Sequence, residues 1–243
     1  MKAEEEIRDI FGPLRNLLTA HQEMGIDPPP VPKEVMKYLE CGASKAQPSS
    51  AELDHPGSLE ALRAFIGECT RCKLHKGRTH LVFGEGSPHA RLVFVGEGPG
   101  QKEDLEGRPF VGEAGQLLTR IIGAMELKRE EVYICNVVKC RPPRNRDPER
   151  DEIETCMPFL KHQLTIIRPE ILCTLGRVAG QSLLGEGFKI THERGKWHSY
   201  NDIPLMPTYH PAYLLRNPSA KRHVWEDVQK IMARLGLEVK TNE

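Results

Sequence analysis

Apolar positions along most of the chain follow two alternating patterns. Four short, continuous apolar runs have the length typical of buried strands, and they lie at residues 91–95, 132–138, 171–175 and 203–207. Five further segments repeat apolar residues every three or four positions, as amphipathic helices do, at residues 59–66, 114–125, 149–167, 178–184 and 218–235. The alternation predicts an α/β fold, a three-layer α/β/α sandwich with a central, mostly parallel four-stranded sheet.

The first 55 residues differ from the rest in composition. An apolar stripe with helical spacing runs from Ile7 to Leu18, but Gly12 and Pro13 interrupt it. Residues 27–32 and 42–56 are rich in Pro, Ser and Ala, as linkers are. We therefore expect residues 1–55 to be an appendage with a helical segment and a Pro/Ser-rich linker, and residues 56–243 to form one domain. The stripe either docks on that domain or recruits a protein partner.

Charge is balanced overall but unevenly placed. The chain has 34 Lys and Arg against 34 Asp and Glu; residues 1–55 hold 6 against 10, so the remainder, 28 against 24, is net +4. Basic side chains gather in two segments, one with Lys139, Arg141, Arg144, Arg146 and Arg150, the other with Arg216, Lys221, Arg222 and His223. Such clusters can neutralise phosphates, although many are only solvated faces, so charge alone leaves nucleic acid and plain solvation both open.

Four of the seven cysteines have metal-site spacing. Two residues separate Cys69 from Cys72 in Cys-Thr-Arg-Cys, and fifteen residues separate Cys140 from Cys156. No apolar run approaches the roughly 18 residues of a membrane span, so we expect a soluble cytoplasmic protein, where paired cysteines hold metal more often than disulfides. Cys135 and Cys173 lie in apolar runs and are expected in the core.

Three motifs fall at or near the predicted carboxyl ends of strands. These are the turn Gly96-Glu-Gly-Pro-Gly100, Asn136 and His210. In parallel sheets such ends meet at one crevice, where ligands bind. The turn lacks the last glycine of a dinucleotide loop and the Lys-Ser/Thr of a P-loop, which argues against both kinds of nucleotide site. Each motif alone could be a mere turn or strand end; their convergence predicts a site.

Five separated motifs occur together in one order. They are Gly96-Glu-Gly-Pro-Gly, Gly107-Arg-Pro-Phe-Val-Gly, Ala114-Gly-Gln-Leu-Leu, Asn136-Val-Val-Lys-Cys-Arg-Pro-Pro and His210-Pro-Ala-Tyr-Leu-Leu-Arg. With the four cysteines, this set resembles the family 4 uracil-DNA glycosylases from about Glu68 to the C-terminal helix. The resemblance implies an α/β/α sandwich that hydrolyses the N-glycosidic bond of uracil in DNA by base flipping and leaves an abasic site.

The resemblance assigns three pocket residues whose chemistry suits the task. Phe110 would stack on the extruded ring. The Asn136 amide would accept from uracil N3-H and donate to O4, a pattern that cytosine reverses. His210 would donate to O2, where negative charge develops as the bond breaks, and a backbone amide at Gly98 would assist.

Two further roles are less direct. Glu97 is the candidate for orienting water near C1′, with Asn145 as the alternative, because related families carry an aspartate one position later, where this chain has Gly98. Related enzymes also place a tyrosine at the position of Gly100 to exclude thymine. We expect Glu103 to fill that space, the alternative being that it only begins a helix.

The resemblance also implies a 4Fe-4S cluster on Cys69, Cys72, Cys140 and Cys156, with zinc as the alternative. The cluster would fix the following basic loop against DNA, with Arg144, Arg146 and Arg216 contacting the backbone. The expected partner is uracil-containing DNA, single- or double-stranded, bound by a monomer. Two other functions compete: a covalent uracil-DNA trap, which in a related group uses a loop histidine that residues 136–149 lack, and a noncatalytic iron-sulfur DNA-binding protein.

Overall fold

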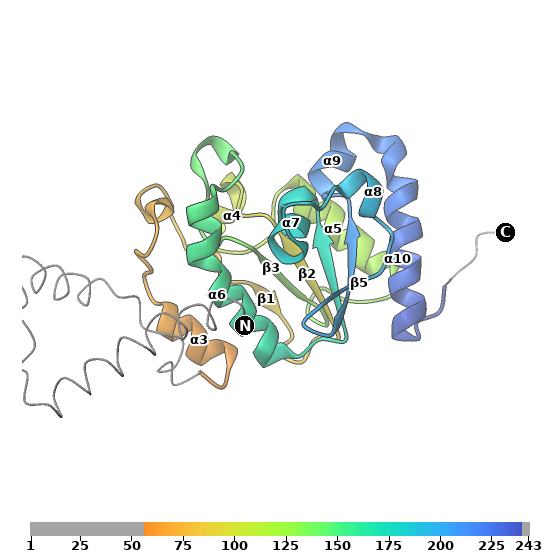
Figure 1. Ribbon diagram of the computed structural model, residues 1–243, viewed down its shortest axis with the longest axis horizontal. Helices are drawn as coiled ribbons and strands as arrows, with labels where there is room; N and C mark the ends of the chain where they lie inside the picture. Colours follow the sequence, from red (N-terminus) through yellow and green to blue (C-terminus); the bar gives the residue numbers. More distant parts are fainter. Residues whose placement is uncertain (1–55, 240–243) are drawn as a thin grey trace, which may run out of the picture. The chain divides into compact units, whose positions relative to one another are not determined.

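Six strands form one sheet in the order β1-β3-β2-β4-β6-β5 (Figure 1). The structure, a computed structural model, describes residues 56–239, so the predicted appendage of residues 1–55 lies outside the described residues. The four predicted strands are the central ones and run parallel: β3 (Tyr133–Asn136), β2 (Leu92–Gly96), β4 (Ile171–Leu175) and β6 (Ile203–Thr208).

The two remaining strands correct the expected four-stranded sheet. β1 (Glu85–Gly86) and β5 (His198–Tyr200) pair antiparallel with β3 and β6 at the two edges. The first has two residues and the second only three, which are partly exposed and mostly polar, so neither produces an apolar run. Edge strands of this kind are defined by their neighbours rather than by their own composition.

All five predicted helical segments are present, with small shifts at their ends. They are α3 (Leu59–Ile66), α5 (Glu113–Ala124), α6 (Arg150–Ile167), α7 (Arg177–Leu184) and the segment at 218–235, which begins as the 3₁₀ turn η3 (Pro218–Ala220) and continues as α10 (Lys221–Leu235). Short elements escaped prediction: α4 (Gln101–Glu106), α8 (Ile190–Glu193), α9 (Pro211–Arg216) and the 3₁₀ turns η1 (Lys73–Lys76) and η2 (Pro143–Asn145). Elements of six residues or fewer are too short to repeat a helical period.

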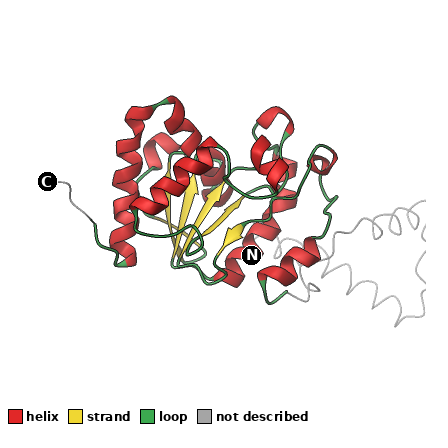
Figure 2. Cartoon of the chain, turned by 180° about the vertical axis from the view of Figure 1, so that it is seen from behind, coloured by secondary structure: helices red, strands yellow, loops and turns green. Residues whose placement is uncertain are grey.

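Helices cover both faces of the sheet, as a three-layer sandwich requires (Figure 2). Val93 and Val95 of β2 join an apolar core with α3, α6 and α7, whereas Leu92 and Phe94 join a second core with α5, α9 and α10. Cys135 and Cys173 are fully buried in these cores, as their sequence context predicts. None of the described helices is long and apolar enough to cross a membrane.

Candidate active site and cysteine cavity

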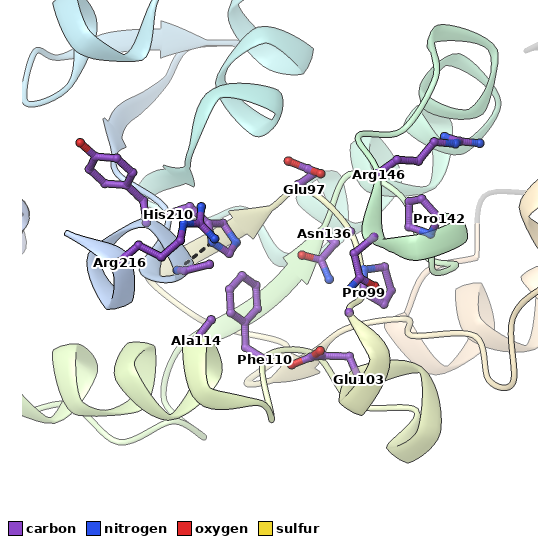
Figure 3. Close-up of a pocket in the computed structure, with 15 residues that line it drawn as sticks. Glu97, Pro99, Glu103, Phe110, Ala114, Asn136, Pro142, Arg146, His210 and Arg216 are labelled. Carbon is purple, nitrogen blue, oxygen red and sulfur yellow. Dashed lines mark hydrogen bonds between the residues drawn. The ribbon is translucent and has the colours of Figure 1, made fainter. Parts of the chain in front are cut away.

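A pocket of about 410 Å³ lies at the carboxyl ends of the parallel strands (Figure 3). Gly96 and Asn136 pair where β2 and β3 end, and His210 follows the end of β6 by two residues. Of the predicted residues outside the cysteine set, all except Arg144 line this pocket: Glu97, Gly98, Glu103, Phe110, Asn136, Asn145, Arg146, His210 and Arg216. The topology therefore brings segments more than a hundred residues apart to one place.

Asn136 has a side-chain oxygen that no described protein group donates to. The residue is 1% exposed, and its side-chain Oδ1 is buried without a hydrogen-bond partner among residues 56–239. A Cβ atom at Gly96 would lie 2.4 Å from this oxygen and 2.6 Å from Phe110 Cζ, so only glycine leaves room at the end of β2. A buried acceptor of this kind calls for a donor, which a bound ligand can supply.

Phe110 forms an aromatic wall opposite His210. Its ring centroid lies 5.5 Å from that of the imidazole, and its side chain is 6% exposed. The backbone of Phe110 has a φ of 52°, in the left-handed region that a bulky side chain rarely adopts. Backbone strain of this kind costs on the order of 1–3 kcal/mol and is typical of ligand clamps.

His210 is held as a neutral hydrogen-bond donor. It is the N-cap residue of α9, and its Nδ1 accepts from the backbone N-H of Ala212 at 3.1 Å. Burial lowers the pKa of His210 to about 4; the Glu103 charge opposes that shift and Arg216 adds to it. Near neutral pH the ring is therefore uncharged, and because Nδ1 is the acceptor, the proton resides on Nε2.

Glu103 connects helix α4 to the segment that follows Phe110. Its Oε1 accepts from the backbone N-H groups of Val111 at 2.9 Å and Gly112 at 2.8 Å, which orders the segment after Phe110. A Cβ atom at Gly100 would lie 2.7 Å from Glu103 Oε2. The Glu103 carboxylate thus occupies the space where a side chain at position 100 would begin.

Glu97 is an electrostatically perturbed carboxyl. Burial raises the pKa of Glu97 to about 7; the negative charge of Asp147 adds to this effect and Arg177 opposes it. Figure 3 places its carboxyl group across Asn136 from Glu103. A carboxyl that is about half ionised near pH 7 suits a general base.

Asn145 has a different environment from Glu97. It is an exposed residue with a φ of 56°, and its Oδ1 already accepts from Arg141 Nε at 2.8 Å. Both side chains line the pocket, but only Glu97 combines burial with a shifted pKa.

The predicted basic surface is less uniform than the sequence indicates. Lys139 is buried, at 1% exposed. Arg146 donates to both carboxylate oxygens of Glu152 at 2.8 and 2.7 Å, and the Glu152 side chain is completely buried. Arg144 and Arg216 are exposed, Arg216 at the pocket and Arg144 outside it. The structure thus gives Arg146 a role within the fold and leaves Arg144 and Arg216 available to a ligand.

The four predicted cysteine ligands line a second cavity. Cys69 and Cys72 are half-buried between α3 and η1, Cys140 follows β3, and Cys156 lies on α6. Within residues 56–239, no group of three or more His, Cys, Asp or Glu side chains is arranged to hold a metal ion. One zinc ion would draw all four sulfurs to about 2.3 Å from a single point, whereas a cluster accepts thiolates spread around a larger volume. Four cysteine thiols around one cavity match the ligand set of a 4Fe-4S cluster as well as that of a zinc ion.

Several site residues went unpredicted. The pocket is also lined by Pro99, Ala114, Pro142, Ala212 and Tyr213, each of which stands inside one of the five sequence motifs but was assigned no role there. Asp147 and Arg177, which act on the charge of Glu97, are paired with each other although thirty residues separate them. Their proximity has no signal in a single sequence.

Comparison with known proteins shows the family of this chain. The family model of the uracil DNA glycosylase superfamily matches residues 83–229. A type-4 uracil-DNA glycosylase of Sulfurisphaera tokodaii is 50% identical over 183 residues, covering 72% of this chain and 83% of that protein. The chain belongs to the type-4 uracil-DNA glycosylase family. Another family member, from Thermotoga maritima, is 47% identical over 178 residues, covering 71% of this chain and 92% of its own length.

Proposed function

We infer that this chain is a DNA repair glycosylase that hydrolyses the N-glycosidic bond of uracil in DNA and leaves an abasic site. Membership in the family carries the activity, because the relatives that match most of the chain are uracil-DNA glycosylases. The pocket that gathers Phe110, Asn136 and His210 at the strand ends is the structural observation that supports it. The substrate is DNA, and we propose that a monomer acts on it, because one pocket suffices for one flipped base.

The base enters the pocket after it leaves the DNA stack. We propose that the ring stacks on Phe110, since base-aromatic stacking is worth about 1–3 kcal/mol in single-strand binders. The buried Asn136 Oδ1 without a partner is matched by uracil N3-H, and the Nδ2 group can then donate to O4. Cytosine presents the opposite pattern and would leave buried groups unpaired, so the pocket rejects it.

His210 acts on the developing charge of the leaving base. As the glycosidic bond stretches, the sugar becomes oxocarbenium-like and the base becomes an anion with charge on O2. A neutral imidazole whose Nδ1 is occupied by Ala212 N-H presents its Nε2-H as the donor to that oxygen. A backbone amide at Gly98 is the second proposed donor, since that residue lines the same pocket.

Two carboxyl groups complete the proposed site. Glu97 orients the water that attacks C1′ and favours the cationic sugar, a role that its raised pKa and half-buried position support better than the environment of Asn145. Glu103 excludes the thymine methyl group by filling the space beside Gly100, where two backbone N-H groups hold its carboxylate in place.

One incubation tests the function against its competitors. The purified chain is mixed with a uracil-containing oligonucleotide, treated with alkali and resolved on a denaturing gel. Multiple turnover with free uracil supports the glycosylase. A covalent protein-DNA band would indicate the trap, and neither product would indicate a noncatalytic binding protein.

The Glu97 assignment predicts how the rate depends on pH. Because only the ionised carboxylate orients water, the single-turnover rate should rise with pH up to about 7 and then level. The pKa of Glu97 in the folded protein lies above its ordinary value of 4.5. The contribution of the protonated Glu97 to the free energy of unfolding is therefore fully present below about pH 4.5 and is lost as pH rises through about 7. Glu97→Gln should be slow and lack both dependences. The exposed Glu130→Gln should behave as wild type; a Glu97→Gln variant with the wild-type pH profile would contradict the role.

The cysteine cavity predicts the cofactor. We propose a 4Fe-4S cluster on Cys69, Cys72, Cys140 and Cys156. The cluster would have a structural role, because hydrolysis of an N-glycosidic bond involves no oxidation or reduction. Anaerobically purified protein should be brown, with about four irons and four sulfides per chain and absorbance near ~400 nm. Cys140→Ser or Cys156→Ser should lose iron and stability, whereas the fully buried core variant Cys173→Ser should keep its iron. Stoichiometric zinc without visible absorbance would favour the alternative.

The arginines of the loop after Cys140 should have separable effects. Arg144→Ala should weaken binding to any DNA sequence and make the slope of log affinity against log salt shallower by about one unit. Arg146→Ala should instead lower the urea concentration at which the fold unfolds, because it leaves the buried Glu152 carboxylate without its main partner. Salt-dependent binding and urea unfolding measure the two effects. If the slope of log affinity against log salt changed only in Arg146→Ala, Arg146 and not Arg144 would be the residue that contacts DNA.

A further inference from the structure

Lys139 is the only buried lysine among residues 56–239, and its ammonium group makes two hydrogen bonds in the interior. Its Nζ donates to the backbone carbonyl of Asn136 at 2.7 Å and to Gln163 Oε1 at 2.6 Å. Burying a charge is costly unless it is hydrogen-bonded and compensated. The position of this lysine therefore needs a physical reason.

Gln163 connects Lys139 to the surrounding framework. It is a fully buried residue of α6, and its Nε2 donates to Phe83 O and to Tyr133 Oη, both at 2.9 Å. The amide is thereby fixed with its oxygen toward Lys139. The carbonyl of Asn136 is thus held from α6 through two consecutive hydrogen bonds, at the residue whose side chain faces the pocket.

The same lysine also borders the cysteine cavity. It lines that cavity, immediately precedes Cys140, and its backbone N-H bonds to the Cys156 thiol. Arg78 lines the same cavity and donates to Cys140 Sγ at 3.2 Å, with a side chain only 7% exposed. Two cationic residues therefore line the cavity that holds the four sulfurs.

The charges explain why the lysine can be buried. Both acceptors of its ammonium group are neutral amide oxygens, so they satisfy hydrogen bonds without cancelling charge. Metal-bound cysteines are thiolates, which supply negative charge next to Lys139. Conversely, the lysine offsets the mutual repulsion of the thiolates.

We propose that Lys139 is a positioning residue that couples the cysteine cavity to base recognition: its charge stabilises the bound cluster while its hydrogen bond holds Asn136 in register. This role rests on the proposed cofactor and the proposed function. It differs from the DNA-contacting role that the sequence pattern indicated for this basic segment.

Two variants separate charge from packing. Lys139→Met removes the charge and keeps the length of the side chain, whereas Gln163→Leu keeps the charge and removes the three hydrogen bonds of the Gln163 amide, including the one that it accepts from Lys139. Metal loss to a chelator, followed by metal analysis, should be about tenfold faster in Lys139→Met than in wild type. Gln163→Leu should release metal at nearly the wild-type rate, even if its Tm falls as much as that of Lys139→Met.

Base recognition provides the second readout. In Lys139→Met the Kd for a uracil-containing oligonucleotide should rise about tenfold, while the Kd for undamaged DNA and its salt dependence stay unchanged. The exposed Lys161→Met is the matched control and should alter neither readout. Equal metal release from Lys139→Met and Gln163→Leu, or an unchanged Kd for uracil-DNA, would overturn the coupling. Failure of the wild-type protein to excise uracil would instead overturn the proposed function, because metal release is measured without substrate.

Discussion

His210→Ala should lower the single-turnover rate of uracil excision on the order of a hundredfold or more, because a donor aimed at developing charge contributes about 3–4 kcal/mol in oxyanion holes. Affinity for uracil-DNA should change little, since O2 carries full charge only as the bond breaks. The low pKa of His210 adds a second expectation. No loss of activity through imidazole protonation should occur above about pH 5.

Rapid-quench kinetics with enzyme in excess measures the bond-breaking step, and a binding titration on an uncleavable uracil analogue measures affinity. His210→Gln, which keeps a donor of similar reach, should recover part of the rate. A near wild-type rate in His210→Ala would show that the site has been assigned to the wrong residue. The proposed glycosylase activity would then be supported only by the similarity to known relatives.

Asn136→Asp should abolish measurable uracil excision, because an ionised carboxylate accepts from N3-H but cannot donate to O4. The pocket would then lack one hydrogen bond and repel a buried carbonyl oxygen. Sites built to hydrogen-bond a substrate discriminate against the wrong partner by as much as about 10⁴-fold. Weak excision of cytosine is the expected gain, since its N4-H₂ group offers the donor that a carboxylate requires.

Parallel assays on uracil- and cytosine-containing oligonucleotides of one sequence test this exchange. Asn136→Ala serves as the matched control, because it removes the amide without presenting a carboxylate. It should lose uracil excision and gain no activity on cytosine. Retained uracil excision in Asn136→Asp would mean that another group reads the base.

The sheet and its main helices could be predicted because their signal is local. The central strands β2, β3 and β4 are buried along their whole length, and α6 carries its apolar residues at helical spacing over eighteen positions. The edge strand β5 has no such signal, because His198, Ser199 and Tyr200 become a strand only through pairing with β6. The same reasoning explains why six-residue α9 was seen only as the motif after His210.

The pocket could be predicted as a set of residues but not as an electrostatic environment. Asn136 and His210 were placed by the rule that parallel strands end at one edge. The partners of the charged residues cannot be predicted from the sequence. Arg146 contacts Glu152 because of how the loop between them folds, and Lys139 donates to Gln163, which lies 24 positions further along the chain. Within this basic segment, Arg144 is exposed, Arg146 forms an ion pair with the buried Glu152, and Lys139 is itself buried.

The close approach at the end of β2 has a consequence for mutational tolerance. Any side chain at Gly96 would displace either the Asn136 amide or the Phe110 ring, and even an added methyl group is too large. Every codon for glycine reaches only larger residues by a single-nucleotide missense change. We therefore expect every single-nucleotide missense change at Gly96 to disturb the proposed uracil pocket, unless a smaller side chain at Asn136 or Phe110 has made room for it beforehand.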